Sequence, residues 1–162
     1  MPLLRNGRLN AADSWIRLAD DEPLPASPPA GATAPPIALG LKRFVEHARH
    51  GAGDVAGVWL APDDDVLALA PHVHRLLLVA IDFPLYTDGR GYSQARLLRT
   101  RLRFGGELRA FGDVRPDQVP FMMRAGIDAF DLAEVPEETL LERALGRYRT
   151  SYQPSYALPI AG

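Results

Sequence analysis

The sequence predicts an α/β fold, in which a single domain holds a mostly parallel open sheet flanked by helices. Two observations lead to this prediction. Short apolar segments of strand length alternate with segments of helical periodicity from residue 37 onward, and several helical segments end at a glycine. The length of 162 residues fits one domain. A complete eight-unit barrel typically needs roughly 200 residues or more, so an open sheet is favoured over a closed one.

Residues 1–36 are expected to form an N-terminal strand followed by a proline-rich linker. Residues 15–18 alternate in the manner of a short strand, and the prolines clustered at 23–36 exclude a helix or a central strand there. The next segment, 37–50, is predicted to be a helix, because its apolar residues share one face and Gly51 follows it.

The α/β domain is expected to span residues 37–150, with a flexible tail at 151–162. Its strands are short apolar runs, of which 75–81 is the most apolar. Its helices begin near an aspartate, a serine or a proline, residue types that suit a helix start. The predicted strands are 55–60, 75–81, 108–111 and 128–132, and the predicted helices after 37–50 are 63–70, 93–104, 117–125 and 136–149.

The composition limits the function classes. The chain has no cysteine, which excludes disulfides, thiol redox catalysis and thiolate-bound zinc or iron–sulfur clusters within it. The net charge of −2 gives no overall attraction to nucleic acid or to an anionic membrane. No apolar run approaches the roughly 20 residues of a membrane-spanning helix, and the N-terminus lacks the apolar core of a secretory signal. We therefore expect a cytoplasmic protein with neither a nucleic-acid nor a membrane partner.

The most informative segment is the loop at 83–93, between the strand at 75–81 and an arginine-rich helix. Loops that follow parallel strands emerge at one edge of the sheet, where α/β proteins bind ligands, and the first turn of the next helix offers free N–H groups. The segment thus indicates a site for a small oxyanion or another polar ligand. The expected ligand-binding residues are Thr87, Asp88, Gly89, Arg90, Gly91, Tyr92, Ser93, Asp113 and Gln118.

Two interpretations of Arg90 stay open. Its guanidinium, placed between two glycines, could chelate an oxyanion with two N–H groups, helped by the hydroxyl of Ser93. Alternatively, Arg90 pairs with Asp88 or Asp113 and stiffens the turn, while Ser93 caps the helix that follows. Asp88 and Asp113 are the candidate catalytic residues for proton transfer if the protein is an enzyme. The structural alternative is that they bind local backbone N–H groups, as turn aspartates commonly do.

Other charged clusters also have a structural and a functional interpretation. Arg96, Arg99 and Arg103 are spaced to share one face of the predicted helix at 93–104, either as a solvated face or as a docking surface for an acidic partner. The three aspartates at 63–65 suit a helix start better than a calcium loop. The four histidines suggest no metal triad, so no metal site is expected.

Several blocks of sequence, spread over roughly residues 13–148, are similar to a known bacterial family. These blocks are Leu60–Asp65, Phe83-Pro84, Thr87–Arg96, Gly106–Ala110, Gly112-Asp113-Val114, Asp117-Gln118 and Gly126–Phe130. They resemble a domain family of unknown function whose genes often neighbour that of the sulfite reductase hemoprotein. Members of that family are commonly described as oxidoreductases of sulfite reduction.

The resemblance implies a role in assimilatory sulfite reduction and leaves two functions open. The first is an accessory or binding protein that recognises the reductase or a small oxyanion through the 86–93 loop. The second is an oxidoreductase-type enzyme of the same pathway that binds sulfite, sulfate or a phosphate group. No cofactor motif is evident, because Gly89-Arg90-Gly91 lacks the third glycine of a dinucleotide fingerprint, and no motif supports a borrowed flavin. The first function is therefore favoured.

Overall fold

The computed structural model describes residues 3–5, 8–10, 13–25, 36–50 and 55–132. Within these residues, eight strands form one sheet in the order β2-β1-β8-β7-β6-β5-β4-β3. The strands from β3 to β8 are parallel to their neighbours, and β1 is antiparallel to both β2 and β8, which confirms a mostly parallel α/β domain. The strands are β1 (Leu3–Arg5), β2 (Arg8–Asn10), β3 (Ile16–Arg17), β4 (Ile37–Gly40), β5 (Gly57–Leu60), β6 (Leu78–Phe83), β7 (Glu107–Gly112) and β8 (Ala129–Asp131).

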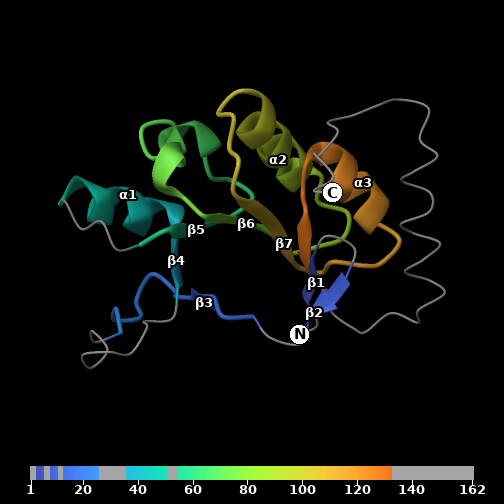
Figure 1. Ribbon diagram of the computed structural model, residues 1–162, viewed down its shortest axis with the longest axis horizontal. Helices are drawn as coiled ribbons and strands as arrows, with labels where there is room; N and C mark the ends of the chain where they lie inside the picture. Colours follow the sequence, from blue (N-terminus) through green and yellow to red (C-terminus); the bar gives the residue numbers. More distant parts are fainter. Residues whose placement is uncertain (1–2, 6–7, 11–12, 26–35, 51–54, 133–162) are drawn as a thin grey trace.

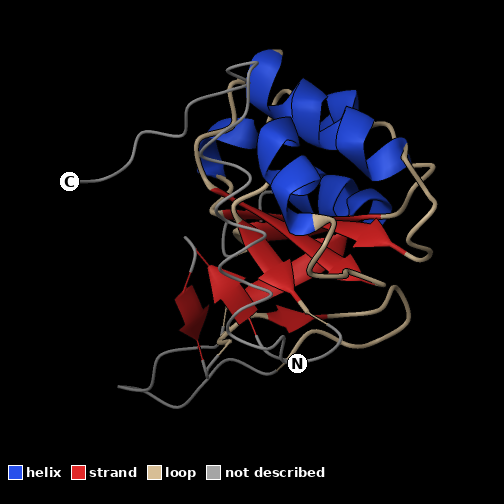
Figure 2. Ribbon diagram, turned by 90° about the vertical axis from the view of Figure 1, so that its right-hand side faces the viewer, coloured by secondary structure: helices blue, strands red, loops and turns tan. Residues whose placement is uncertain are grey.

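The described helices all lie on one side of the sheet (Figures 1 and 2). Because β4 to β8 follow one another in space as they do in sequence, each crossover between them returns to the adjacent strand and leaves its helix or 3₁₀ turns on that same side. The apolar core lies between these two layers and includes Phe44, Leu98 and Met122 from the helices. The helices are α1 (Leu41–Arg49), α2 (Arg90–Thr100) and α3 (Val119–Ala125), with 3₁₀ turns η1 (Val66–Leu69) and η2 (Val73–Arg75).

Three predicted boundaries need correction. The segment predicted as a helix over 37–50 forms strand β4 and then helix α1. The sequence did not separate the two elements, because a short apolar run fits a buried strand as well as a helix. The segment predicted as a helix over 63–70 forms only the 3₁₀ turn η1. The helix α2 begins at Arg90 rather than Ser93, so part of the expected loop is helical.

The N-terminal hairpin of β1 and β2 was not expected from the sequence. The strand β1 extends the sheet beyond β8, with Leu4 paired to Phe130 and fully buried. The N-terminal segment is thus part of the sheet and of its core. The helix predicted at 136–149 and the tail at 151–162 lie outside the described residues. In the part that the structure describes, no helix is long and apolar enough to cross a membrane.

The sheet is strongly curled. Arg17 in β3 and Asp131 in β8 form an ion pair of 2.5 Å, although four strands separate β3 from β8. In a flat sheet, five strand spacings of about 4.8 Å would place these strands roughly 24 Å apart, well beyond the reach of an arginine side chain. The sheet therefore curls away from the helices. We call the face opposite the helices the concave face.

Candidate functional site at the carboxyl edge of the sheet

Three strand-end loops meet at the carboxyl edge of the sheet, as the parallel topology requires. We call them together the rim: residues 61–65 after β5, 84–90 after β6 and 113–118 after β7. The side-chain amide of Gln94 donates to the carbonyl oxygen of Ala61 at 2.8 Å. The amide of Gln118 donates to the carbonyl oxygen of Tyr86 at 2.7 Å, which ties the second loop to the third. Residues 133–136 follow the predicted strand at 128–132 and are expected from the sequence to form a fourth loop at this edge, but they lie outside the described residues.

Arg90 is held by two carboxylates of the rim. Its Nε lies 3.0 and 3.2 Å from the two carboxylate oxygens of Asp88, its Nη2 lies 2.6 Å from Oδ2, and its Nη1 pairs with Asp63. These hydrogen bonds from the guanidinium lower the pKa of Asp88 to about 2. The structure therefore shows the ion-pair arrangement for Arg90. An oxyanion would have to approach this guanidinium beside two carboxylates that already bind it, against their negative charge.

Ser93 does not cap α2, because it lies inside the first turn and is exposed. Instead, Asp88 accepts a hydrogen bond of 3.0 Å from the backbone N–H of Arg90 at the helix start. Gly91 faces the core, where a Cβ would lie 2.5 Å from the ring of Phe83. Tyr92 packs edge-on against the same ring, with centroids 5.4 Å apart. Gly91 and Tyr92 thus fasten α2 to the sheet rather than face a ligand.

Asp113 fixes the tip of the loop that follows β6. Its Oδ2 accepts a hydrogen bond of 3.2 Å from the backbone N–H of Tyr86. Arg115 pairs with Asp113 at 3.2 Å, and its guanidinium carbon lies 4.1 Å from the centroid of the Tyr86 ring. The hydrogen bond from Arg115 lowers the pKa of Asp113. Leu85 and Tyr86 stay 62% and 50% exposed at this tip, with Thr87 and Gly89 exposed beside them.

Asp88 and Asp113, the candidate catalytic residues of the rim, are unsuited to proton transfer at neutral pH. Asp88 and Asp113 both have lowered pKa values, whereas a general acid or base works best with a pKa near the working pH. Asp64 accepts from the backbone N–H of Ala61 at 2.7 Å, and Asp65 accepts from that of Leu67 at 3.0 Å at the start of η1. Among the residues that the structure describes, no group of histidine and carboxylate side chains has the arrangement of a metal site.

The predicted docking stripe on α2 is interrupted. Arg96 is exposed, but the Arg99 side chain is only 9% exposed and donates to the carbonyl oxygens of Phe104, Gly106 and Gly126. Arg99 also pairs with Asp128 at 2.8 Å. Arg103 lies beyond the end of α2 with a φ of 55°. Arg99 therefore holds α2 to β8 and is not available to a partner.

A cluster of buried charges on the concave face was missed by sequence reasoning. Arg109 in β7 is 2% exposed and pairs with Glu107 at 2.6 Å and with Asp13. It also lies 3.8 Å from Asp131, the partner of Arg17. The signal for this cluster is the alternation of Glu107 and Arg109 with apolar residues in a strand, which places both charges on one face.

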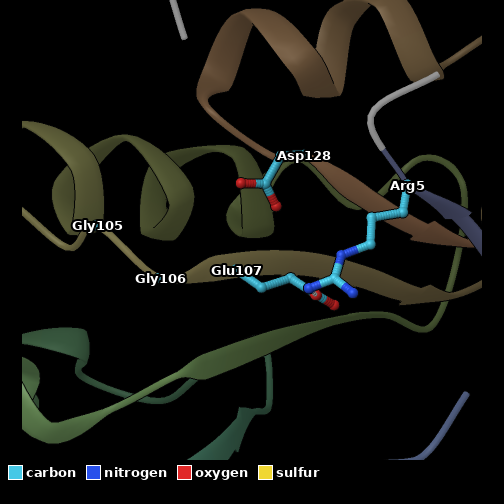
Figure 3. Close-up of a pocket in the computed structure, with 5 residues that line it drawn as sticks. All are labelled: Arg5, Gly105, Gly106, Glu107 and Asp128. Carbon is cyan, nitrogen blue, oxygen red and sulfur yellow. Dashed lines mark ion pairs between the residues drawn. The ribbon is translucent and has the colours of Figure 1, made fainter. Parts of the chain in front are cut away.

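A small polar depression of about 170 Å³ opens at the amino end of β7 (Figure 3). Its charged groups already have partners: Arg5 pairs with Glu107 at 2.5 Å, and Asp128 accepts from Arg99 and from the backbone N–H of Leu108. The remaining lining comes from Gly105 and Gly106. This depression lies at the edge of the sheet opposite the rim, and its side chains are engaged in holding the fold.

The sequence comparisons identify the family. Residues 57–161 match a family of bacterial proteins of unknown function, DUF934, and the chain belongs to this family. The matched segment contains all three loops of the rim. No curated protein matches the chain.

Proposed function

We propose that this protein is an accessory protein of bacterial sulfite reduction that docks onto the sulfite reductase hemoprotein through the rim. The observation that carries the proposal is the loop tip at Leu85 and Tyr86. Both side chains are at least half exposed. The backbone of the tip is held in place because the N–H of Tyr86 donates to Asp113 and its carbonyl oxygen accepts from Gln118. A large apolar or aromatic side chain that is exposed and pre-organised is typical of a protein-binding anchor.

The charge of the rim supports a protein partner over a small oxyanion. The three loops carry six aspartates and two arginines, which leaves a net charge of −4. Both arginines are engaged, Arg90 by Asp88 and Asp63 and Arg115 by Asp113. Such a surface repels free anions and favours a partner with a basic surface around an apolar pocket.

The sulfite reductase hemoprotein is the proposed partner because of the sequence blocks that resemble the family encoded beside it. Several of these blocks coincide with the rim, including Leu60–Asp65, Thr87–Arg96 and Asp117-Gln118. A docking role also agrees with the low pKa values of Asp88 and Asp113, which suit fixed charges better than proton carriers.

Co-purification of the tagged protein with the hemoprotein tests this proposal. The wild-type chain is expected to retain the reductase, and Leu85→Asp to lose at least about 90% of it, because a carboxylate in an apolar pocket must be desolvated. Leu77→Asp is the matched control: Leu77 is 64% exposed and precedes β6 at the opposite edge of the sheet. Loss of the complex by both variants, or by neither, would contradict docking through the rim.

A titration with sulfite and with sulfate separates docking from oxyanion binding. The proposal expects no heat of binding at millimolar anion for the wild-type chain, since both rim arginines already bind carboxylates. A saturable signal that disappears in Arg90→Ala would instead support the oxyanion interpretation of the rim.

A further inference from the structure

Among the described strand residues, the charged side chains of the concave face are paired with one exception. The strands β1 and β3 to β8 direct six charged residues to this face. Five of them, Arg5, Arg17, Glu107, Arg109 and Asp131, form ion pairs with one another. The sixth is Asp82, near the carboxyl end of β6. No described residue donates a hydrogen bond to its carboxylate or forms an ion pair with it.

The environment of Asp82 disfavours an unpaired carboxylate. The side chain is half-buried, and this burial raises its pKa against the opposing effect of Arg17. Its Oδ1 lies 2.9 Å from the position that a Cβ on Gly112 would occupy, so the carboxylate packs closely over the backbone of the neighbouring strand. A desolvated carboxylate without a donor costs stability, and natural proteins keep such groups mainly where function requires them.

The arrangement around Phe111 indicates what Asp82 would bind. Phe111 is paired in register with Asp82 on one side, and β8, which carries Asp131, runs along its other side. Asp131 binds the guanidinium of Arg17, which lies 4.2 Å from the centroid of the Phe111 ring. The aromatic ring thus already accommodates one planar cation next to a carboxylate. Asp82 is a second carboxylate beside the same ring.

The position of Asp82 also suits a ligand site. In curled parallel sheets with helices outside, functional side chains come from the carboxyl ends of the strands. Asp82 is the fifth of the six residues of β6, a central strand, and it points to the face away from the helices. Trp59, from the adjacent strand β5, is half-buried on the same face and adds aromatic surface.

We propose that Asp82 anchors the cationic nitrogen of a small planar ligand, of the amidinium or ring-linked ammonium class, on the concave face beside Phe111. A planar amidinium matches a carboxylate with two parallel N–H···O bonds, and an attached ring gains contact with the aromatic side chains. This site is separate from the exposed loop tip of the rim, and it does not depend on the docking function.

Benzamidine is a suitable probe, because it joins an amidinium to one aromatic ring. In an NMR titration at pH 7, the wild-type chain is expected to bind benzamidine in the millimolar range or tighter, with the largest amide shifts at residues 81–83 and 111–113. Asp82→Asn is expected to weaken the affinity at least about tenfold, because it removes the charge and keeps the shape. Asp117→Asn, which removes an exposed carboxylate of the rim, is expected to bind like the wild type.

Thermal melting of the same variants provides a second readout. Asp82→Asn is expected to melt at or above the wild-type temperature, since it removes a half-buried charge that has no hydrogen-bond donor among the described residues. A lower melting temperature would show that the carboxylate holds a structural contact, and would overturn the proposal. The proposal would also be overturned if the wild-type chain bound no benzamidine at concentrations up to 20-fold above about 1 mM. Equal affinity of Asp82→Asn and the wild type for benzamidine would have the same meaning.

Discussion

Arg90 and Asp88 define the chemistry of the rim at the scale of single residues. The guanidinium makes three contacts with the Asp88 carboxylate, and the pKa of Asp88 falls to about 2. In the folded protein this carboxylate is therefore easier to ionise than in the unfolded chain, where its pKa is near 3.8. The ion pair between Arg90 and Asp88 stabilises the fold fully at pH values above 3.8. Its contribution to the free energy of unfolding disappears as the pH falls through about 2.

Replacing Arg90 is expected to raise the pKa of Asp88. In Arg90→Ala the pKa of Asp88 should rise from about 2 towards its ordinary value of 3.8, because the side-chain hydrogen bonds are lost while the bond from the backbone N–H remains. Carbon-detected NMR of the carboxyl group measures this directly. The stability difference between the two proteins should also narrow as the pH falls from 4 to about 2. An unchanged pKa would mean that Arg90 does not bind Asp88 in solution.

Buried charge is the second feature at this scale. Arg109 is enclosed by Glu107, Asp13 and Asp131, so its removal takes a buried cation away from three carboxylates. Glu107 and Asp131 then keep the more exposed Arg5 and Arg17 as partners, and Asp13 loses its ion pair. Arg109→Ala is expected to lower the free energy of unfolding by about 3–5 kcal/mol, as measured by urea denaturation. Arg101→Ala, at an exposed arginine after α2, serves as the control and should change stability by less than about 0.5 kcal/mol. Equal losses of stability in Arg109→Ala and Arg101→Ala would contradict the buried network of ion pairs around Arg109.

At the scale of elements, α2 depends on one arginine for its attachment to β8. Arg99 donates to three carbonyl oxygens and to Asp128, whose pKa is raised by burial in spite of the nearby guanidinium. Gly126, which ends α3 with a φ of 102°, lies against Arg99, and a Cβ there would come within 2.5 Å of its Cγ. The helix ends and the start of β8 are therefore packed around this side chain.

Two arginines of the same helix provide a matched test of this attachment. Arg99→Ala is expected to cost about 3 kcal/mol in the free energy of unfolding, because it leaves Asp128 and three carbonyl groups without their donor. Arg96→Ala, at the exposed position three residues earlier, should stay within about 0.5 kcal/mol of the wild type. Chemical denaturation of both variants measures the difference. If both variants lost similarly little stability, Arg99 would be as exposed as Arg96, in agreement with the stripe predicted from the sequence.

The elements differ in how far the sequence could predict them. The central strands β5 to β8 follow from apolar runs bounded by glycine, proline or charge. Strand β4, at residues 37–40, could not be predicted in this way, since its apolar pattern continues into α1 and fits a strand or a helix. The β1–β2 hairpin had a signal that was overlooked: Asn6-Gly7 is a dipeptide typical of tight hairpin turns.

At the scale of the whole molecule, the curl of the sheet decides which residues meet. It brings Arg17 to Asp131 and Asp13 to Arg109, although these residues lie 114 and 96 positions apart in the sequence. Sequence periodicity predicts which face a residue occupies, but not this curvature. For that reason the loops of the rim could be predicted to meet, whereas the burial of Arg109 by residues that are distant in the sequence could not.

A double-mutant cycle between Arg17 and Asp131 tests the curl. Arg17→Ala, Asp131→Ala and the double variant are expected to show a coupling free energy of about 0.5–2 kcal/mol, because the two charges meet across the concave face. The free energy of unfolding of the four proteins provides this value. A coupling near zero would indicate a flatter sheet, in which β3 and β8 lie far apart.

Hydrogen exchange of the protein in complex with the sulfite reductase hemoprotein is the most direct test of the rim as a docking surface. We expect added protection of the backbone amides at 85–90 and 113–118, with little change at the opposite edge around Leu77 and 105–107. Protection confined to that opposite edge, or no protection at reductase concentrations that saturate any complex, would contradict the proposed function.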